Sequence, residues 1–371
     1  MNAHVVVVFE GDYAGPEVVR EGLKVLREVE RQTPCLMINL EHHKIGAAAW
    51  DEFGVPITPV TLARATSASA VLLGAVGGPK WASAPVAVES GLGQLRKAMQ
   101  AFGNLRPVSF LSPSAVANSA LKPEKCAGTD IMIVRELTGG MYFGPRQEPD
   151  ADLTVAYDTD LYTRTEIERV TRLAASLATT SDPPLPVTSL DKANALAATG
   201  RLWRSVVNQV MDAEFPSVPL RHILVDSAAM VMACNPTQLN GVVLTSNMFG
   251  DIISDVASVI PGSIGLLPSA SPGGIPNSNS GPECFIKGLY EPVHGSAPDI
   301  AGQGIINPTG MILSVAMMFK YSLNMPEAAA AIESAVRDTM EAGVRTRDLG
   351  GSASTSQFGD AVVAALASKY G

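Results

Sequence analysis

Two aspartates recur at a spacing that suits a metal site. The segment NMFGDIISD at 247–255 places Asp251 and Asp255 four residues apart. In a helix this spacing puts both carboxylates on one face, where like charges repel by a few tenths of a kcal/mol. A divalent ion such as Mg²⁺ or Mn²⁺ accepts two carboxylates and leaves positions for substrate and water. The alternative is that the acids only favour a helix N-terminus.

Two further ionisable side chains follow strand-like segments. Asp226 follows Leu224-Val225, and Lys192 follows Ser189-Leu190-Asp191. A carboxylate at the carboxyl end of a parallel strand commonly faces a ligand cleft. Asp226 as a helix N-cap and Lys192 as a solvated surface lysine are the alternatives.

Three arginines stand in apolar or Gly/Pro-punctuated surroundings: Arg96, Arg106 and Arg135. Guanidinium groups bind carboxylates bidentately, so three in one pocket would suit a di- or tricarboxylate. Structural ion pairs are the alternative for each. Tyr142, in TGGMYFG, is either a core aromatic or a proton donor.

Composition excludes several classes of partner. The 371 residues include 27 Lys plus Arg and 36 Asp plus Glu, a net charge of -9, which disfavours nucleic acid and anionic membranes. The four cysteines show no metal-ligand spacing. No apolar run reaches the roughly 18 to 20 residues that span a bilayer, and no targeting segment is evident. We expect a cytoplasmic protein.

The chain must position these residues with alternating strands and helices. Short apolar runs predict buried strands, and periodic segments between them predict helices, which together indicate an α/β fold. Thr163 to Glu166 fits a capping box that opens a helix, and 272–288 is expected to be a long surface loop. The expected strands lie at 5–9, 70–73, 131–134, 186–190, 223–225 and 242–244, and helices after residue 300 at 310–321, 326–342 and 355–368. No GxGxxG, GxxxxGK[ST], HExxH or GxSxG signature is present.

Ordered sequence blocks carry a resemblance that spans almost the whole chain. They are LLGAVGGPKW at 72–81, NLRP at 104–107, VRELTGG at 134–140, SLDKAN at 189–194, NMFGDIISD at 247–255, GLLPSAS ending at 271, and GLYEPVHGSAPDIAG at 288–302. With these blocks the chain resembles the 3-isopropylmalate dehydrogenase family of β-decarboxylating dehydrogenases. The resemblance implies two doubly wound α/β lobes around a cleft. Residues 1–102 and 262–371 would form a cofactor-binding lobe, and 103–261 a central lobe with the metal aspartates and dimer interface.

The resemblance also implies a role for each residue. Asp226, Asp251 and Asp255 match the metal ligands, with Asp226 and the base Lys192 coming from the partner in a homodimer, and Tyr142 matches the general acid. Substrate contacts are implied for Arg96, Arg106, Arg135, Asp226, Leu92, Gly93 and Ala195. Cofactor contacts are implied for Glu89, Glu291, His294, Gly295, Ser296, Ala297, Asp299, Asn307 and Asp348.

The implied reaction is NAD-dependent oxidation and decarboxylation of a 3-substituted malate, as in leucine biosynthesis. A metal would lower the pKa of the substrate hydroxyl, Lys192 would remove its proton, and Tyr142 would protonate the enol carbon. Asp299 favours NAD because a carboxylate would repel a 2'-phosphate.

Two positions depart from the family pattern at the wall that faces the malate side chain. Gly93 stands where leucine is usual, and Ala195 where valine is usual. Either neighbours compensate, or the substrate is bulkier than isopropylmalate, such as a benzyl- or hydroxybenzylmalate. A third departure, Tyr13 in place of a common glycine, is expected to loosen contacts beside the adenine.

The sequence argues against two other functions. An isocitrate-type substrate would need a polar residue where Leu92 stands. A non-catalytic regulatory subunit would lack a metal ligand or Lys192, yet all are present.

Overall fold

The strands form one large sheet that continues through the whole molecule. The computed structural model describes residues 2–149, 151–152, 154–276 and 286–369. In these residues the large sheet has ten strands in the order β2-β1-β3-β12-β11-β4-β5-β10-β8-β9. Their bounds are β1 Asn2–Gly11, β2 Leu36–His43, β3 Ala70–Ala75, β4 Gly103–Ser109, β5 Asp130–Glu136, β8 Val187–Asp191, β9 Leu220–Leu224, β10 Gly241–Thr245, β11 Pro268–Pro272 and β12 Gly288–Pro292.

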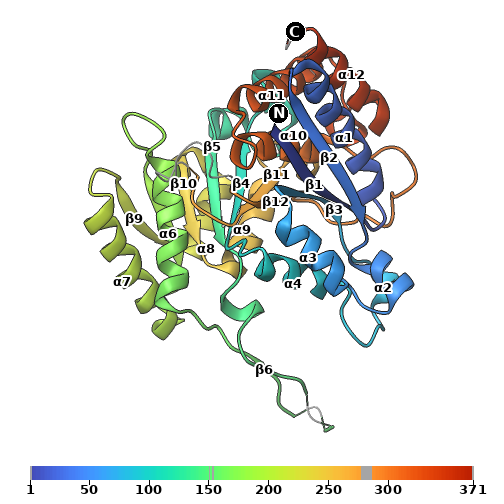
Figure 1. The fold of residues 1–371 in the computed structure, drawn as a ribbon. Coiled ribbons are helices and arrows are strands. Elements are labelled where there is room, and N and C mark those ends of the chain that lie inside the picture. The colour runs from blue at the N-terminus through green and yellow to red at the C-terminus, as the bar shows by residue number, and fades with distance from the viewer. Residues whose placement is uncertain (1, 150, 153, 277–285, 370–371) are drawn as a thin grey trace.

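Two groups of helices pack against the sheet, one at each half of the strand order (Figure 1). Helices α1, α10, α11 and α12 pack together beside β1 and β3, whereas α6 and α7 pack together beside β8 and β10. The α/β class predicted from the sequence is confirmed. The helices are α1 Gly15–Gln32, α2 Ala47–Phe53, α3 Pro59–Ser67, α4 Ser90–Ala98, α5 Pro123–Cys126, α6 Arg164–Ala178, α7 Ala197–Glu214, α8 Val225–Cys234, α9 Asn247–Ser258, α10 Thr309–Tyr321, α11 Pro326–Glu341 and α12 Thr355–Ala367.

Antiparallel strands join two parallel halves. Strands β2, β1, β3 and β12 are mutually parallel, as are β5, β10, β8 and β9, and the pairs β12–β11, β11–β4 and β4–β5 between them are antiparallel. The two predicted lobes therefore share one hydrogen-bonded sheet. The residue at which one lobe gives way to the other stays a prediction.

Local signals in the sequence placed most helices well. The capping box at α6 is present, with the Thr163 side chain accepting from Glu166 and the Glu166 side chain from Thr163. The three helices after residue 300 begin and end within one residue of the predicted ranges. One strand boundary was wrong: 223–225 was expected as a strand, but β9 ends at Leu224 and α8 begins at Val225. Of the loop expected at 272–288, residues 277–285 lie outside the described part of the chain.

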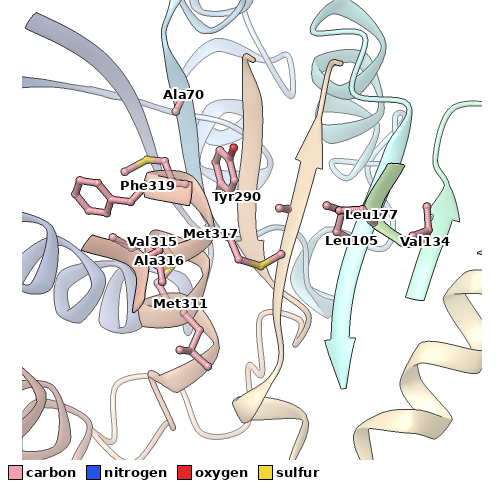
Figure 2. Packing of buried hydrophobic residues seen from close by; sticks show 14 of the residues in the cluster. Ala70, Leu105, Val134, Leu177, Tyr290, Met311, Val315, Ala316, Met317 and Phe319 are labelled. Atoms are coloured by element: carbon pink, nitrogen blue, oxygen red, sulfur yellow. The ribbon is translucent and has the colours of Figure 1, made fainter. Parts of the chain in front are cut away.

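The hydrophobic core runs under the middle of the sheet (Figure 2). Leu105 on β4, Val134 on β5 and Tyr290 on β12 are fully buried, and α10 contributes Phe319 and its neighbours from the same helix. The Tyr290 hydroxyl forms a 2.6 Å hydrogen bond with the Ser322 hydroxyl, so its polar end is satisfied inside this core. The strands that carry the candidate site are therefore anchored in one continuous packed interior.

Two features lie outside this core. A two-stranded arm, β6 Arg146–Gln147 and β7 Tyr157–Asp158, extends away from the body of the molecule (Figure 1). None of the helices in the described ranges combines the length and apolar character needed to cross a membrane.

Candidate active site

Two buried guanidinium groups form the centre of the site. Arg106 lies on β4 and Arg135 at the end of β5, on adjacent antiparallel strands. Only 8% and 4% of these side chains are exposed. Burial, together with the positive charge of Arg106, lowers the pKa of Arg135 to about 10. Two neighbouring buried cations require anions beside them.

Helix α9 supplies those anions. Asp251 Oδ1 lies 2.5 Å from Arg135 Nη1 and 3.9 Å from Arg106 Nη2, and Asp255 Oδ1 lies 3.6 Å from Arg106 Nη1. The two carboxylates project from one helix face, as their spacing predicts. The cationic partner expected for them from the sequence is thus supplied in part by the arginines.

Tyr142 reaches the same carboxylate from a turn after β5. It ends the short helix η3 Gly140–Tyr142, and its hydroxyl donates to Asp251 Oδ2 at 3.0 Å. The side chain is 42% exposed, so the core-aromatic alternative is wrong. Burial of its hydroxyl and the nearby charge of Asp251 raise the pKa of Tyr142, which keeps the phenol protonated at neutral pH. We call Arg106, Arg135, Tyr142, Asp251 and Asp255 the acid–arginine cluster.

The cluster fits a divalent ion only in part. Asp251 and Asp255 offer hard oxygen ligands, and 61% of the Asp255 side chain is open to solvent. Nowhere in the described ranges do three or more His, Cys, Asp or Glu side chains gather as metal ligands. One chain therefore supplies two carboxylate ligands, and the remaining positions around an ion would be left for other oxygen ligands.

Lys192 and Asp226 form a separate pair at the same edge of the sheet. Lys192 follows β8, Asp226 lies in the first turn of α8 after β9, and Lys192 Nζ is 2.7 Å from Asp226 Oδ2. The hydrogen bond from Lys192 lowers the pKa of Asp226. Asp226 is not a helix N-cap, since Leu224 occupies that position. Across the described residues, no hydrogen bond or ion pair joins this lysine pair to the acid–arginine cluster.

The third arginine lies beside the cluster but is paired elsewhere. Arg96, in the last turn of α4, donates to Glu291 Oε1 on β12 at 2.7 Å. Glu291 is buried, whereas Glu89 is exposed and its carboxylate lies over Gly77. The positive charge of Arg96 contributes to the lowered pKa of Arg106, which places the three arginines within electrostatic reach of one another.

The loop after β12 carries most of the expected cofactor residues. His294 is partly buried; its Nε2 atom is buried and has no partner in the described part of the chain, and burial lowers the pKa of the ring. Asn307 donates to Asp348 Oδ2 at 2.9 Å, and the negative charge of Asp348 interacts with His294. An unpartnered buried ring nitrogen beside a carboxylate and an amide suits a nucleoside ligand.

The rest of this loop is held close to the first loop of the chain. Ser296 is buried and its carbonyl accepts from the Ala14 N–H at 2.9 Å, while Ala297 adopts a φ of 41°. Gly295 and Asp299 are exposed. The Asp299 carboxylate is thus accessible to ribose hydroxyls.

Of the residues expected at the wall of the substrate pocket, two lie near Arg96 and one lies near Lys192. Leu92 and Gly93 lie on α4, one turn before Arg96, and a methyl group placed on Gly93 would meet no atom within 4 Å. Ala195 is exposed in the turn after Lys192, where its N–H donates to the Lys192 carbonyl. The space at Gly93 is therefore open in the folded chain.

Sequence reasoning missed three buried polar side chains, two of which hold the cluster in place. Asn104 and Asn247 are buried amides that accept hydrogen bonds from Arg106 and Arg135, respectively. Asp12 is buried and holds the first loop, where it accepts from the N–H groups of Ala47, Ala48 and Gly77. The available signal for the two asparagines was their place in the blocks NLRP and NMFGDIISD.

Tyr13, the residue expected to loosen contacts beside the adenine, packs against residues 78–81. Its φ of 49° lies in the left-handed region that glycine favours. Its ring lies over Gly78 and packs edge-on against Trp81 at a centroid distance of 5.6 Å.

Comparison with known proteins finds that the chain is similar to dehydrogenases. The model of the isocitrate/isopropylmalate dehydrogenase family matches residues 5–362. A protein named 3-isopropylmalate dehydrogenase AMT6, from Alternaria alternata, is 68% identical over 364 residues, covering 98% of this chain and 97% of that protein. An isopropyl malate dehydrogenase named htyC, from Aspergillus rugulosus, is 60% identical and covers 97% of this chain and 96% of that protein. Among solved structures, an isocitrate dehydrogenase from Methylococcus capsulatus has a TM-score of 0.84 at 30% identity, covering 98% and 99% of the two chains.

Two helical glycines should respond in opposite directions to the same substitution. A methyl group on Gly250 would lie 2.5 Å from Arg135 Cγ, so Gly250→Ala should lower the free energy of unfolding by roughly 1 to 3 kcal/mol. Gly93→Ala adds a methyl group in open space and should raise it by about 0.4 to 1 kcal/mol. Urea unfolding of both variants measures this, and effects of the same sign would contradict the packing described for α9.

Proposed function

The chain belongs to the isocitrate/isopropylmalate dehydrogenase family, and we propose that it oxidises and decarboxylates a 3-substituted malate with NAD and a divalent metal. The observation that carries the proposal is the acid–arginine cluster, in which two buried guanidinium groups face two carboxylates and a phenol. A divalent cation bound by the two carboxylates would leave the guanidinium groups free to bind the carboxylates of a dicarboxylate substrate. 3-Isopropylmalate is the first candidate substrate, which would place the enzyme in leucine biosynthesis.

In the proposed reaction the arginines bind the substrate and the two aspartates hold the metal. Arg96, Arg106 and Arg135 bind the two malate carboxylates and fix the orientation of the hydroxyl-bearing carbon. Asp251 and Asp255 hold Mg²⁺ or Mn²⁺. When bound, this ion lowers the pKa of the substrate hydroxyl and stabilises negative charge on its oxygen.

Proton transfer is assigned to Lys192 and Tyr142. Lys192 accepts the proton of the malate hydroxyl as hydride leaves the adjacent carbon for NAD. After loss of CO₂, Tyr142 donates its phenolic proton to the enol carbon. Its raised pKa suits this role, since the phenol must be protonated when that step begins.

We assign NAD to the loop after β12. His294, Asn307 and Asp348 would contact the adenosine, the backbone of 295–297 would line its site, and Asp299 would accept from ribose hydroxyls. Glu89 and Glu291 would lie towards the nicotinamide. This set is supported by the unpartnered Nε2 atom of His294 and the open carboxylate of Asp299.

The active site is proposed to form between two copies of the chain. Within the described residues, no hydrogen bond or ion pair joins Lys192 or Asp226 to the cluster of their own chain, although the proposed chemistry needs the base and a third carboxylate beside the metal. Three apolar side chains are exposed on the helices that carry Asp226 and the aspartates of the cluster: Met230 on α8, and Ile252 and Val256 on α9. A second copy packed there would cover them and bring its Lys192 and Asp226 to Asp251.

Complementation between defective subunits tests this shared site. Lys192→Ala and Asp251→Asn homodimers should each lose NADH formation with 3-isopropylmalate. Unfolding and refolding a mixture of the two should restore roughly a quarter of wild-type activity, because half of the dimers would be mixed and each would hold one intact site. A mixture that stays inactive, while its size matches a dimer, would contradict the shared site.

A bulkier substrate is the second candidate, and the open space at Gly93 favours it. A leucine there would occupy the volume that a benzyl group on the malate could fill. The distinction concerns only the side chain of the malate, since the carboxylate and metal contacts would be the same.

Turnover of 3-isopropylmalate and 3-benzylmalate by the wild type and by Gly93→Leu separates these candidates. If the bulky substrate is correct, the wild type prefers 3-benzylmalate, and Gly93→Leu shifts kcat/KM towards 3-isopropylmalate by about 10- to 200-fold. A wild type that strongly prefers 3-isopropylmalate would rule out the bulky substrate.

A further inference from the structure

Asn247 contacts both Arg135 and the turn after β5 that carries Tyr142. It is the first residue of α9 and is 1% exposed. Its Oδ1 atom accepts from Arg135 Nη2 at 2.8 Å and Nε at 3.1 Å, and its Nδ2 donates to the Gly139 carbonyl at 3.0 Å. Arg135 only donates and the carbonyl only accepts, so these partners allow one orientation of the amide.

Gly139 begins the turn that carries Tyr142. Its N–H donates to the buried carboxylate of Glu136 at 2.7 Å, so Asn247 and Glu136 hold this residue from both sides. Three residues later, the Tyr142 hydroxyl meets Asp251. The position of the phenol relative to α9 thus depends on how Gly139 is held.

Two residues of helix α9 therefore contact the same two partners, Arg135 and the turn that carries Tyr142. Asn247 and Asp251 lie one turn apart on one face, and each contacts both Arg135 and the turn that carries Tyr142. The two contacts differ in function, because Asp251 is also a proposed metal ligand. A carboxylate that coordinates a cation gives up part of its interaction with Arg135 and Tyr142, whereas the neutral amide of Asn247 does not.

We propose that Asn247 is a positioning residue that keeps the substrate-binding Arg135 and the proton donor Tyr142 in a fixed relation throughout the reaction. This inference rests on the proposed function. The amide oxygen and nitrogen of Asn247 are both taken up by protein partners, so it acts through these two neighbours. It occupies the Nε and Nη2 edge of Arg135, so Nη1 is the group turned towards the cluster.

The chain offers a matched control in Asn104. This asparagine is also fully buried and accepts from the Nε of an arginine, Arg106, at 2.6 Å. Its amide donates to Ser271 Oγ at 2.9 Å and does not contact the turn that carries Tyr142. Asn104→Ala therefore removes the support of an arginine alone, and Asn247→Ala removes the support of an arginine and of the proton donor.

Two reactions distinguish the effect of Asn247→Ala from that of Asn104→Ala. The first is NADH formation from 3-isopropylmalate, in which loss of either asparagine should raise KM by roughly tenfold to a hundredfold. The second is exchange of the C3 protons of the 2-oxo acid product into D₂O, followed by NMR at saturating product with NADH and Mg²⁺. This exchange reverses the protonation step, so Asn247→Ala should slow it at least about tenfold, and Asn104→Ala by less than about threefold.

Asn247→Asp provides a second variant in case the alanine variant does not fold. Its carboxylate still accepts from Arg135 but cannot donate to the Gly139 carbonyl. Proton exchange should therefore remain as slow as in Asn247→Ala. Exchange restored to the wild-type rate would contradict the proposal.

Amide hydrogen exchange across residues 139–144 gives a readout that is independent of activity. Asn247→Ala and Asn247→Asp should speed this exchange, and Asn104→Ala should not. Equal effects of Asn104→Ala and Asn247→Ala on both proton exchange and amide exchange would overturn the positioning role. A wild type that forms no NADH with any 3-substituted malate would refute the proposed function instead, and the amide exchange would still decide the role of Asn247.

Discussion

Two like charges buried side by side set the main constraint on this molecule. Arg106 and Arg135 lie on adjacent strands, and each guanidinium is almost wholly removed from water. Such a pair is tolerated only where anions and hydrogen-bond acceptors surround it. Helix α9 provides two carboxylates, and Asn104 and Asn247 provide neutral acceptors. The close approach of α9 to Arg135, for which Gly250 leaves room, follows from the same constraint.

Sheet topology explains why the site is divided. Strands β5, β10, β8 and β9 are parallel, so their carboxyl ends lie at one edge, where the acid–arginine cluster and the Lys192–Asp226 pair both occur. No hydrogen bond or ion pair joins the two groups within the described residues. The second subunit proposed above would resolve this separation, and it would also cover the apolar side chains exposed on α8 and α9.

Sequence alone predicted the features that depend on local pattern. The capping box at Thr163, the helices after residue 300 and the shared helix face of Asp251 and Asp255 follow from spacing along the chain. The single continuous sheet did not follow, because the pairing of β11 with β4 and of β12 with β3 joins segments far apart in sequence. The roles of Asn104 and Asn247 were missed for a similar reason: a buried amide is recognised by its partners, and those come from other strands and turns. The left-handed Tyr13 was missed because glycine is the usual residue at such a φ.

The central claim is that one cation is held by carboxylates from two subunits above the buried arginines. The most direct measurement is a crystal structure with Mn²⁺ and a 3-substituted malate, in which anomalous scattering locates the metal. The account predicts one Mn²⁺ per site, bound by Asp251 and Asp255 of one subunit and Asp226 of another, with the malate carboxylates on Arg106 and Arg135. Mn²⁺ bound by a single subunit, or away from Asp251, would contradict it.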